Sequence, residues 1–183
     1  MRQYGREQFT SADIALVASE PFVHQDYRSA LFEIYEEVSR ALAVPARSVM
    51  LTGSAFTGRS FIKDQPFRPG ESDLDLAVVD RDLFRELLLC ASRATRYFRD
   101  QTPFKPASGF KTGTETFTNF RSYAFNRGII RPDLMPECEA KNQIGDLCQS
   151  LTNKYIDIFH HVSIAIYGDE EYFVAKANHR GAA

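Results

Sequence analysis

The sequence has few features of secreted, membrane-spanning or strongly basic proteins. Its three cysteines, Cys90, Cys138 and Cys148, show no Cys-x-x-Cys spacing, and their odd number argues against a disulfide framework. We expect reduced, partly buried thiols in a cytoplasmic protein. No apolar run approaches the roughly 18 residues of a membrane span, and the start MRQYGREQFT is too polar for a signal peptide. With a net charge of −2, the chain as a whole does not attract polyanions such as nucleic acid, so any site that binds a polyanion must be a local cluster of basic residues.

The composition is that of an ordinary globular domain. The chain has 183 residues, of which 44% are hydrophobic and 25% charged. This length is enough for one domain with a real core. Because we find no repeat, low-complexity tract or clear linker, we predict a single domain over residues 1–183.

Hydrophobic periodicity predicts a small α/β or α+β fold, in which helices flank a short mixed sheet. Its central hairpin would join two strands through a long loop over residues 54–72. Residues 101–136 read as a long ordered loop with one helical turn near 119–125. The expected helices cover residues 11–20, 24–44, 80–100, 137–154 and 169–178, and the expected strands cover 48–53, 73–79 and 155–168.

The predicted hairpin carries an unusual set of polar residues. Gly53 and Ser54 end the first strand, and Asp73 and Asp75 lie two residues apart on the second. Residues at this spacing on a strand point to the same face, so the two carboxylates lie side by side while Leu74 and Leu76 face the core. Two adjacent carboxylates repel each other, and a divalent cation such as Mg²⁺ resolves that conflict. The alternative is a solvated strand whose polar face is acidic by chance.

The remaining residues of this stretch suit a phosphate ligand. Gly53 allows the backbone to approach a ligand closely, and Ser54 offers a hydroxyl and an amide. Three cations in the loop could neutralise further phosphate charge, although a polar loop is often basic by chance. The predicted nucleotide-binding residues are Gly53, Ser54, Arg59, Lys63, Arg68 and Ser72.

The pattern Gly53-Ser54, a loop, then Ser72-Asp73-Leu74-Asp75-Leu76 resembles the nucleotidyltransferase superfamily of the DNA polymerase β type. The resemblance implies that the Gly-Ser pair holds the triphosphate of a nucleotide and that the aspartates bind Mg²⁺, in a site for two ions. It also implies a third carboxylate on a later strand, which helps to activate the nucleophile. The loop is longer here than is usual in the family.

We predict that Asp157 is this third carboxylate. It lies within the strand-like run KYIDIFHHVSIAIY, flanked by Ile156 and Ile158. A lone aspartate on an apolar strand is costly unless a partner such as a metal ion compensates it. The alternative places Asp157 at the exposed entrance of the strand or at the end of the preceding helix. Glu115 and Asp133 are weaker candidates, because they lie in loop-like sequence.

The function expected from this resemblance is a Mg²⁺-dependent enzyme. It would transfer a nucleoside monophosphate from a nucleoside triphosphate to a hydroxyl of a protein, an RNA 3′ end or a small molecule. By analogy, a minimal transferase of this size fits a toxin–antitoxin or phage-defence module. A second hypothesis is a weakly active or inactive binding module with a partner protein. A third is a metal-dependent phosphohydrolase.

Two further patterns bear on function. The stretch FRSYAFNR mixes aromatic and basic residues, which suits base stacking and phosphate contact, but a helix that packs Phe120, Tyr123 and Phe125 inward is the simpler interpretation. His160 and His161 are adjacent, so on a strand they point to opposite faces. We therefore expect them to be packing or surface residues rather than ligands of one metal.

Overall fold

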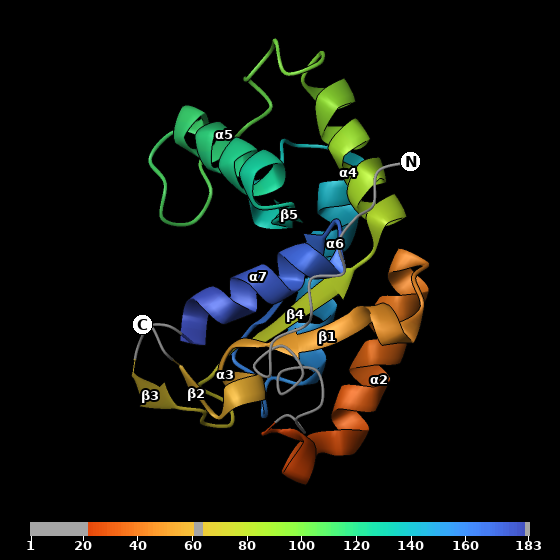
Figure 1. The fold of residues 1–183 in the computed structure, drawn as a ribbon, viewed down its shortest axis with the longest axis vertical. Helices are drawn as coiled ribbons and strands as arrows, with labels where there is room; N and C mark the ends of the chain where they lie inside the picture. Colours follow the sequence, from red (N-terminus) through yellow and green to blue (C-terminus); the bar gives the residue numbers. More distant parts are fainter. Residues whose placement is uncertain (1–21, 61–63, 182–183) are drawn as a thin grey trace, which may run out of the picture.

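The computed structural model describes residues 22–60 and 64–181, and it confirms the mixed α+β class (Figure 1). The expected helix over residues 11–20 lies outside the described residues. The main sheet has four strands in the order β1-β4-β6-β5, and β2 (Arg59–Ser60) and β3 (Gln65–Pro66) form a separate small hairpin. No helix of the described residues has the length and hydrophobicity needed to cross a membrane.

The predicted central hairpin is present. β1 (Val49–Thr52) and β4 (Leu74–Val79) pair antiparallel, with Thr52 opposite Asp75. β6 (Val162–Tyr167) then pairs parallel with β4, and β5 (Ile129–Ile130) pairs antiparallel with β6. The two central strands of the sheet, β4 and β6, are therefore hydrogen-bonded to each other although they lie far apart in the sequence.

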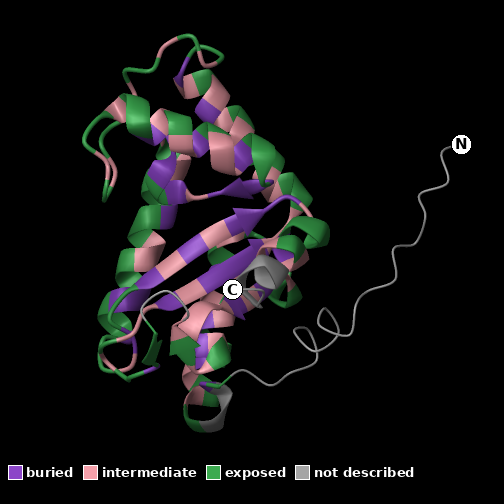
Figure 2. Ribbon diagram, turned by 60° about the vertical axis from the view of Figure 1, so that its left-hand side comes forward, coloured by how far each residue is buried: buried purple, intermediate pink, exposed green. Residues whose placement is uncertain are grey.

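The two faces of β4 have different roles. Leu74, Leu76 and Val78 are buried in the main core, which also holds apolar residues of the helices α2 (His24–Leu42) and α6 (Glu139–Lys154). Ala77 faces the other way, into a small cluster with Phe173 of α7 (Glu170–Gly181). Since side chains alternate along a strand, Asp75 shares the α7 face with Ala77. Figure 2 shows the strands of the main sheet buried or partly buried and the helices exposed on their outer sides.

Most of the predicted helices are present. Asp80 caps α4, since its carboxylate accepts a hydrogen bond of 2.8 Å from the Leu83 amide. The sequence pattern extends α4 to residue 100, but the helix ends at Ala94, where the hydroxyl of the next residue, Thr95, donates back to the Ala91 carbonyl. The main helices are α2 (His24–Leu42), α3 (Gly53–Thr57), α4 (Arg81–Ala94), α5 (Gly113–Arg121), α6 (Glu139–Lys154) and α7 (Glu170–Gly181), and the short helical turns are η1 (Ala46–Ser48), η2 (Ser122–Asn126) and η3 (Pro132–Leu134).

The prediction of a long loop over residues 101–136 holds only in part. The helical turn expected near residues 119–125 coincides with the end of α5 and with η2, but the segment also contains the rest of α5, β5 and η3. A capping box starts α5: Thr112 accepts from the Glu115 amide, and the Glu115 carboxylate accepts from the Thr112 amide. Phe120 of α5 is buried as expected, but Phe125 is exposed. The inward-packing interpretation of FRSYAFNR therefore holds for only part of it.

The three cysteines are free and partly buried, as expected. Burial raises the pKa of the Cys148 thiol to about 11. This thiol therefore stays protonated near neutral pH, which does not favour a nucleophilic role.

Candidate functional site

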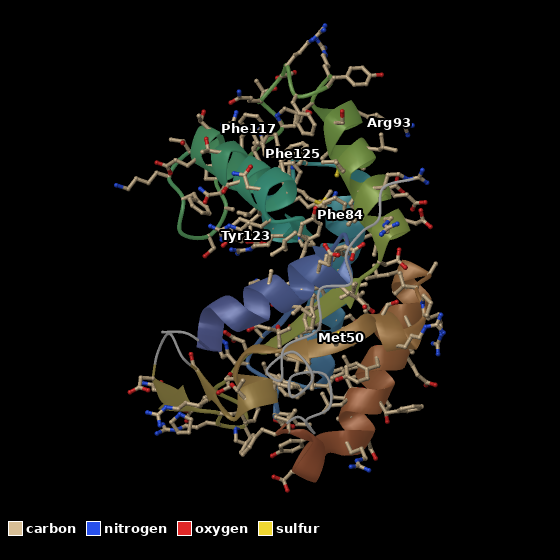
Figure 3. All side chains as sticks on the ribbon, in the orientation of Figure 1. Met50, Phe84, Arg93, Phe117, Tyr123 and Phe125 are labelled. Carbon is tan, nitrogen blue, oxygen red and sulfur yellow. The ribbon has the colours of Figure 1, made fainter. Side chains whose placement is uncertain are left out.

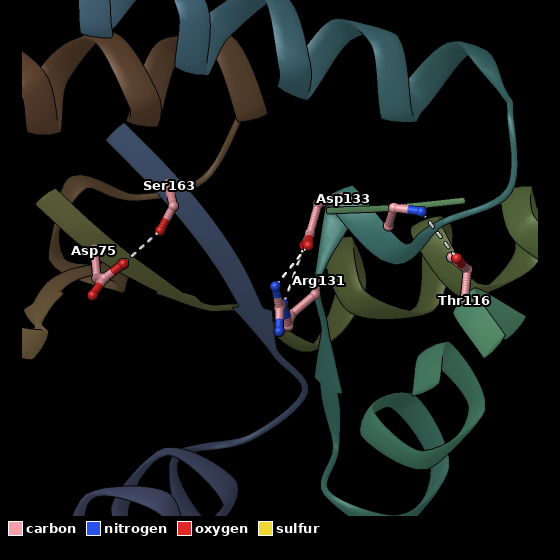
Figure 4. Close-up of polar contacts among 6 residues, drawn as sticks. Asp75, Thr116, Arg131, Asp133 and Ser163 are labelled. Carbon is pink, nitrogen blue, oxygen red and sulfur yellow. Dashed lines mark hydrogen bonds and ion pairs between the residues drawn. The ribbon is translucent and has the colours of Figure 1, made fainter. Parts of the chain in front are cut away.

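The candidate site lies on the α7 face of the sheet, where β1, β4 and β6 meet. Thr52, Asp75 and Ser163 are neighbours across the three strands. The Ser163 hydroxyl donates a hydrogen bond of 2.7 Å to Oδ1 of Asp75 (Figure 4). Thr52 donates from its hydroxyl to the main-chain carbonyl of Asp75 at 3.2 Å. The Asp75 carboxylate is therefore held in one orientation by the neighbouring strand.

Gly53 approaches this carboxylate from β1. It has φ of +69°, a left-handed conformation that favours glycine, and a Cβ added there would lie 2.5 Å from Oδ2 of Asp75. Only a residue without a side chain fits this position without displacing the carboxylate. The structure thus brings Gly53, at the start of α3, directly against Asp75.

We expect Gly53→Ala to destabilise the protein more than the strain of placing alanine at a positive φ would by itself. The new methyl group must push the Asp75 carboxylate away and break its bond to Ser163. Gly109→Ala is a matched control, since Gly109 has φ of +85° and a Cβ added to it would meet no atom within 4 Å. In urea denaturation, Gly53→Ala should lower the unfolding free energy by about 1 kcal/mol more than Gly109→Ala, the net contribution of one hydrogen bond. Equal losses would contradict this contact.

Asp73 lies just before β4 and beside a histidine. The Nδ1 atom of His160 is 3.4 Å from Oδ1 of Asp73. Backbone bonds from His160 N to the Ser72 carbonyl and from Leu74 N to the His161 carbonyl bring these two segments together. Asp73 and His160 are both partly or largely exposed, so they lie at the solvent-facing edge of the site.

The loop residues predicted to bind phosphate have other partners. Arg59 forms an ion pair with Asp64 at 2.7 Å, and Arg68 forms one with Glu71 at 3.4 Å. The Ser72 hydroxyl accepts a hydrogen bond of 2.9 Å from the Arg68 amide, so it stabilises the turn before β4. Lys63 lies outside the described residues.

The predicted strand placement of Asp157 is wrong, and the alternative, an exposed position after the preceding helix, is the one observed. Its role as a third carboxylate stays a prediction. β6 begins at Val162, and Asp157 is an exposed residue of the turn that follows α6. The amides of Ile158 and Phe159 both donate to the Tyr155 carbonyl, which closes a local turn instead of a sheet ladder. Within residues 22–60 and 64–181, no group of three His, Cys, Asp or Glu side chains could hold a metal ion.

Two residues of the site are not identified by sequence patterns. Ser163 carries no motif of its own, although it occupies an outward position of the expected last strand. His160 has the pattern of a packing or surface residue. Their proximity to Asp75 and Asp73 depends on the parallel pairing of β4 with β6, which local periodicity does not reveal.

No family model matches the chain, and no significant match is found among curated proteins or among solved structures.

Proposed function

We propose that the chain is a Mg²⁺-dependent nucleotidyltransferase that takes a nucleoside triphosphate and transfers a nucleoside monophosphate to an acceptor hydroxyl. The observation that carries the proposal is the placement of Gly53 against Asp75 on an antiparallel hairpin. A Gly-Ser and Asp-x-Asp pattern supports a nucleotide site only when its two halves come together on paired strands, and β1 and β4 pair in this way.

The residues present fit a magnesium ion. Mg²⁺ is usually bound by one or two carboxylates, together with substrate phosphates and water. Asp75 provides a partly exposed carboxylate on β4, and Asp73, directly before β4, provides a second partly exposed carboxylate. The ion would supply positive charge to the triphosphate. The chain itself would orient Asp75 through Ser163 and provide a close backbone approach at Gly53.

A second candidate function is supported by Ser163. The resemblance implies a third carboxylate on a later strand, and Ser163 is the residue of β6 that is in register with Asp75. A hydroxyl at this position binds metal more weakly than a carboxylate and is a poorer general base. This favours a nucleotide-binding module with weak or no transferase activity, associated with a partner protein.

The test is incubation of the purified protein with each α-labelled nucleoside triphosphate, Mg²⁺ and a cell lysate. Under the first proposal, label appears on a protein, an RNA or a small molecule, and chelation of Mg²⁺ removes it. Binding of the triphosphate without transfer favours the second function, and release of free monophosphate without an acceptor indicates hydrolysis. If no triphosphate binds in the presence of Mg²⁺, both proposals are wrong.

A further inference from the structure

Positive charge is concentrated in one part of the chain. Residues 93–131 contain eight lysines and arginines and two acidic residues, a net charge of +6, whereas the whole chain has a net charge of −2. These residues include the last turn of α4, all of α5 and the segment between them. Figure 1 shows α4 and α5 at one end of the molecule and α3, β2 and β3 at the other.

The two acidic residues of this segment are engaged by local hydrogen bonds. Asp100 accepts bonds from the amide and the hydroxyl of Thr102, and these bonds lower its pKa. Glu115 accepts from the amides of Lys111 and Thr112 as part of the helix cap. Both carboxylates thus have structural roles in turns rather than in ion pairs with the nearby arginines.

Five arginines of the segment, Arg93, Arg96, Arg99, Arg121 and Arg127, are exposed and form no ion pair with a carboxylate in the described part of the chain. Three of them, Arg96, Arg99 and Arg121, lie in the turn after α4 and at the end of α5. Arg131, by contrast, is paired with Asp133 through two hydrogen bonds (Figure 4). The guanidinium groups of Arg96, Arg99 and Arg121 are suited to bind phosphates.

A left-handed turn presents part of this surface to solvent. Arg96, Tyr97 and Phe98 have φ of 47°, 61° and 63°, which is costly for residues other than glycine. The turn is held by the buried Thr95, whose hydroxyl accepts from the Phe98 amide at 3.1 Å, and by a bond from Tyr97 N to the Ser92 carbonyl. As a result, the Tyr97 side chain is 75% exposed while Phe98 packs inward.

Phe98 connects this turn to α5 and η2. Its ring centroid lies 6.4 Å from that of Phe117 and 6.0 Å from that of Phe125. The Arg121 guanidinium lies over the Phe117 ring at 5.9 Å. Figure 3 shows Phe117 and Phe125 in the region between α4 and α5. Phe125 is nevertheless 55% exposed, so its ring is available to an external partner.

We propose that Arg96, Tyr97, Arg99, Arg121 and Phe125 form a binding surface for single-stranded nucleic acid, which we call the basic aromatic surface. The arginines would bind phosphates, and the two exposed rings would stack on unpaired bases. A duplex exposes base faces only at its ends, and an acidic peptide carries far fewer flat π-systems per negative charge than a single strand does. The combination of available cations with exposed aromatics therefore favours a single strand.

This surface is separate from the candidate site. Asp75 lies near the start of β4, whereas the basic aromatic surface lies beyond the far end of α4, the helix that follows β4. The inference does not depend on nucleotidyl transfer, since the surface would bind a strand whether or not the chain is an enzyme.

The test is fluorescence anisotropy of the full chain with a labelled single-stranded RNA of mixed sequence and about 12 nucleotides, within the range of known site sizes. DNA of the same sequence, the corresponding duplex and inorganic polyphosphate are measured in parallel. We expect the single-stranded RNA or DNA to bind at least about tenfold more tightly than the duplex, since stacking contributes roughly 1–3 kcal/mol per base.

Two double variants separate stacking from charge. Tyr97→Ala with Phe125→Ala should weaken binding at least about 30-fold, because two rings that contribute roughly 1–3 kcal/mol each are removed, and should leave the salt dependence unchanged. Arg96→Gln with Arg121→Gln should reduce the slope of log K against log salt by about 1.4, because each phosphate contact to a single strand contributes about 0.7.

Matched controls lie on other parts of the chain. Phe32→Ala removes an aromatic that is 62% exposed on α2, and Arg40→Gln with Arg47→Gln removes two exposed cations. Both controls should bind like the parent. Tyr97→Leu with Phe125→Leu retains apolar bulk, so it tests stacking even if the alanine variant fails to fold.

Three results would overturn the proposal. They are no binding of single-stranded RNA or DNA at about 0.1 M salt, polyphosphate or the duplex binding as tightly as the single strand, and the Tyr97→Ala with Phe125→Ala variant binding like the parent. The second result would mean that the surface attracts any polyanion, and the third would place the site elsewhere.

Discussion

Asp75→Asn is expected to lower the affinity for a nucleoside triphosphate in the presence of Mg²⁺ by about 10- to 100-fold. The substitution removes a charged ligand of the cation, and interactions with charged groups contribute roughly 1.5–3 kcal/mol. Asparagine retains an oxygen that accepts the hydrogen bond from Ser163, so the fold should not change. Isothermal titration calorimetry with Mg²⁺, and again with a chelator, measures the effect.

The controls distinguish the loss of a cation ligand at this site from the loss of one negative charge anywhere on the protein. Asp146→Asn removes an exposed carboxylate of α6 and should leave triphosphate binding unchanged. Asp157→Asn tests the residue that the sequence predicts as the third carboxylate, and a loss as large as that of Asp75→Asn would restore it as a ligand. If Asp75→Asn binds triphosphate like the parent, the nucleotide site lies elsewhere.

The parts of the fold that depend on local sequence were predictable. The spacing of apolar residues indicated α2, α4 and α6, and the helix expected from residue 80 begins in the structure directly after its N-cap, Asp80. The alternation of Asp73, Leu74, Asp75 and Leu76 indicated a half-buried strand, and the buried leucines confirm it. These features depend on interactions within a few residues.

The errors lie where local patterns compete with tertiary contacts. The apolar alternation of residues 155–168 continues through a turn, so the strand was expected to start too early. The amide of Val162, where β6 begins, instead donates to the Thr152 hydroxyl at 2.9 Å. α5 was missed because its segment is rich in Thr, Gly and Phe, although Thr112 and Glu115 have the spacing of a capping box.

Only the residues of the candidate site that lie close together in the sequence were predictable. Gly53, Asp73 and Asp75 lie within 23 residues of one another, so a sequence motif can include them all. Ser163 is 88 residues away from Asp75, its hydrogen-bond partner, and their contact depends on parallel pairing of β4 with β6. The composition of a strand does not specify its neighbour, so the residue opposite Asp75 could not be identified before the fold was known.

Gly113→Ala is expected to have the largest effect on stability, a loss of about 3 kcal/mol or more in the free energy of unfolding. A Cβ at residue 113 would lie 1.9 Å from the carbonyl oxygen of Phe104. This oxygen belongs to the backbone and cannot rotate away as a side chain could. Phe104 is itself buried against Phe117 and Phe120, with ring centroids 5.0 and 5.6 Å apart, so displacing it would disrupt the aromatic packing beneath α5.

Gly145→Ala is the matched control for this substitution. Gly145 also lies in a helix, α6, but a Cβ added to it would meet no atom within 4 Å. Alanine is preferred to glycine within a helix by up to about 1 kcal/mol, so this variant should be slightly more stable than the parent. Urea denaturation should therefore give changes of opposite sign for the two helical glycines. A Gly113→Ala protein as stable as the parent would mean that α5 does not start against the Phe104 carbonyl, and the packing that supports the basic aromatic surface would then differ from that described above.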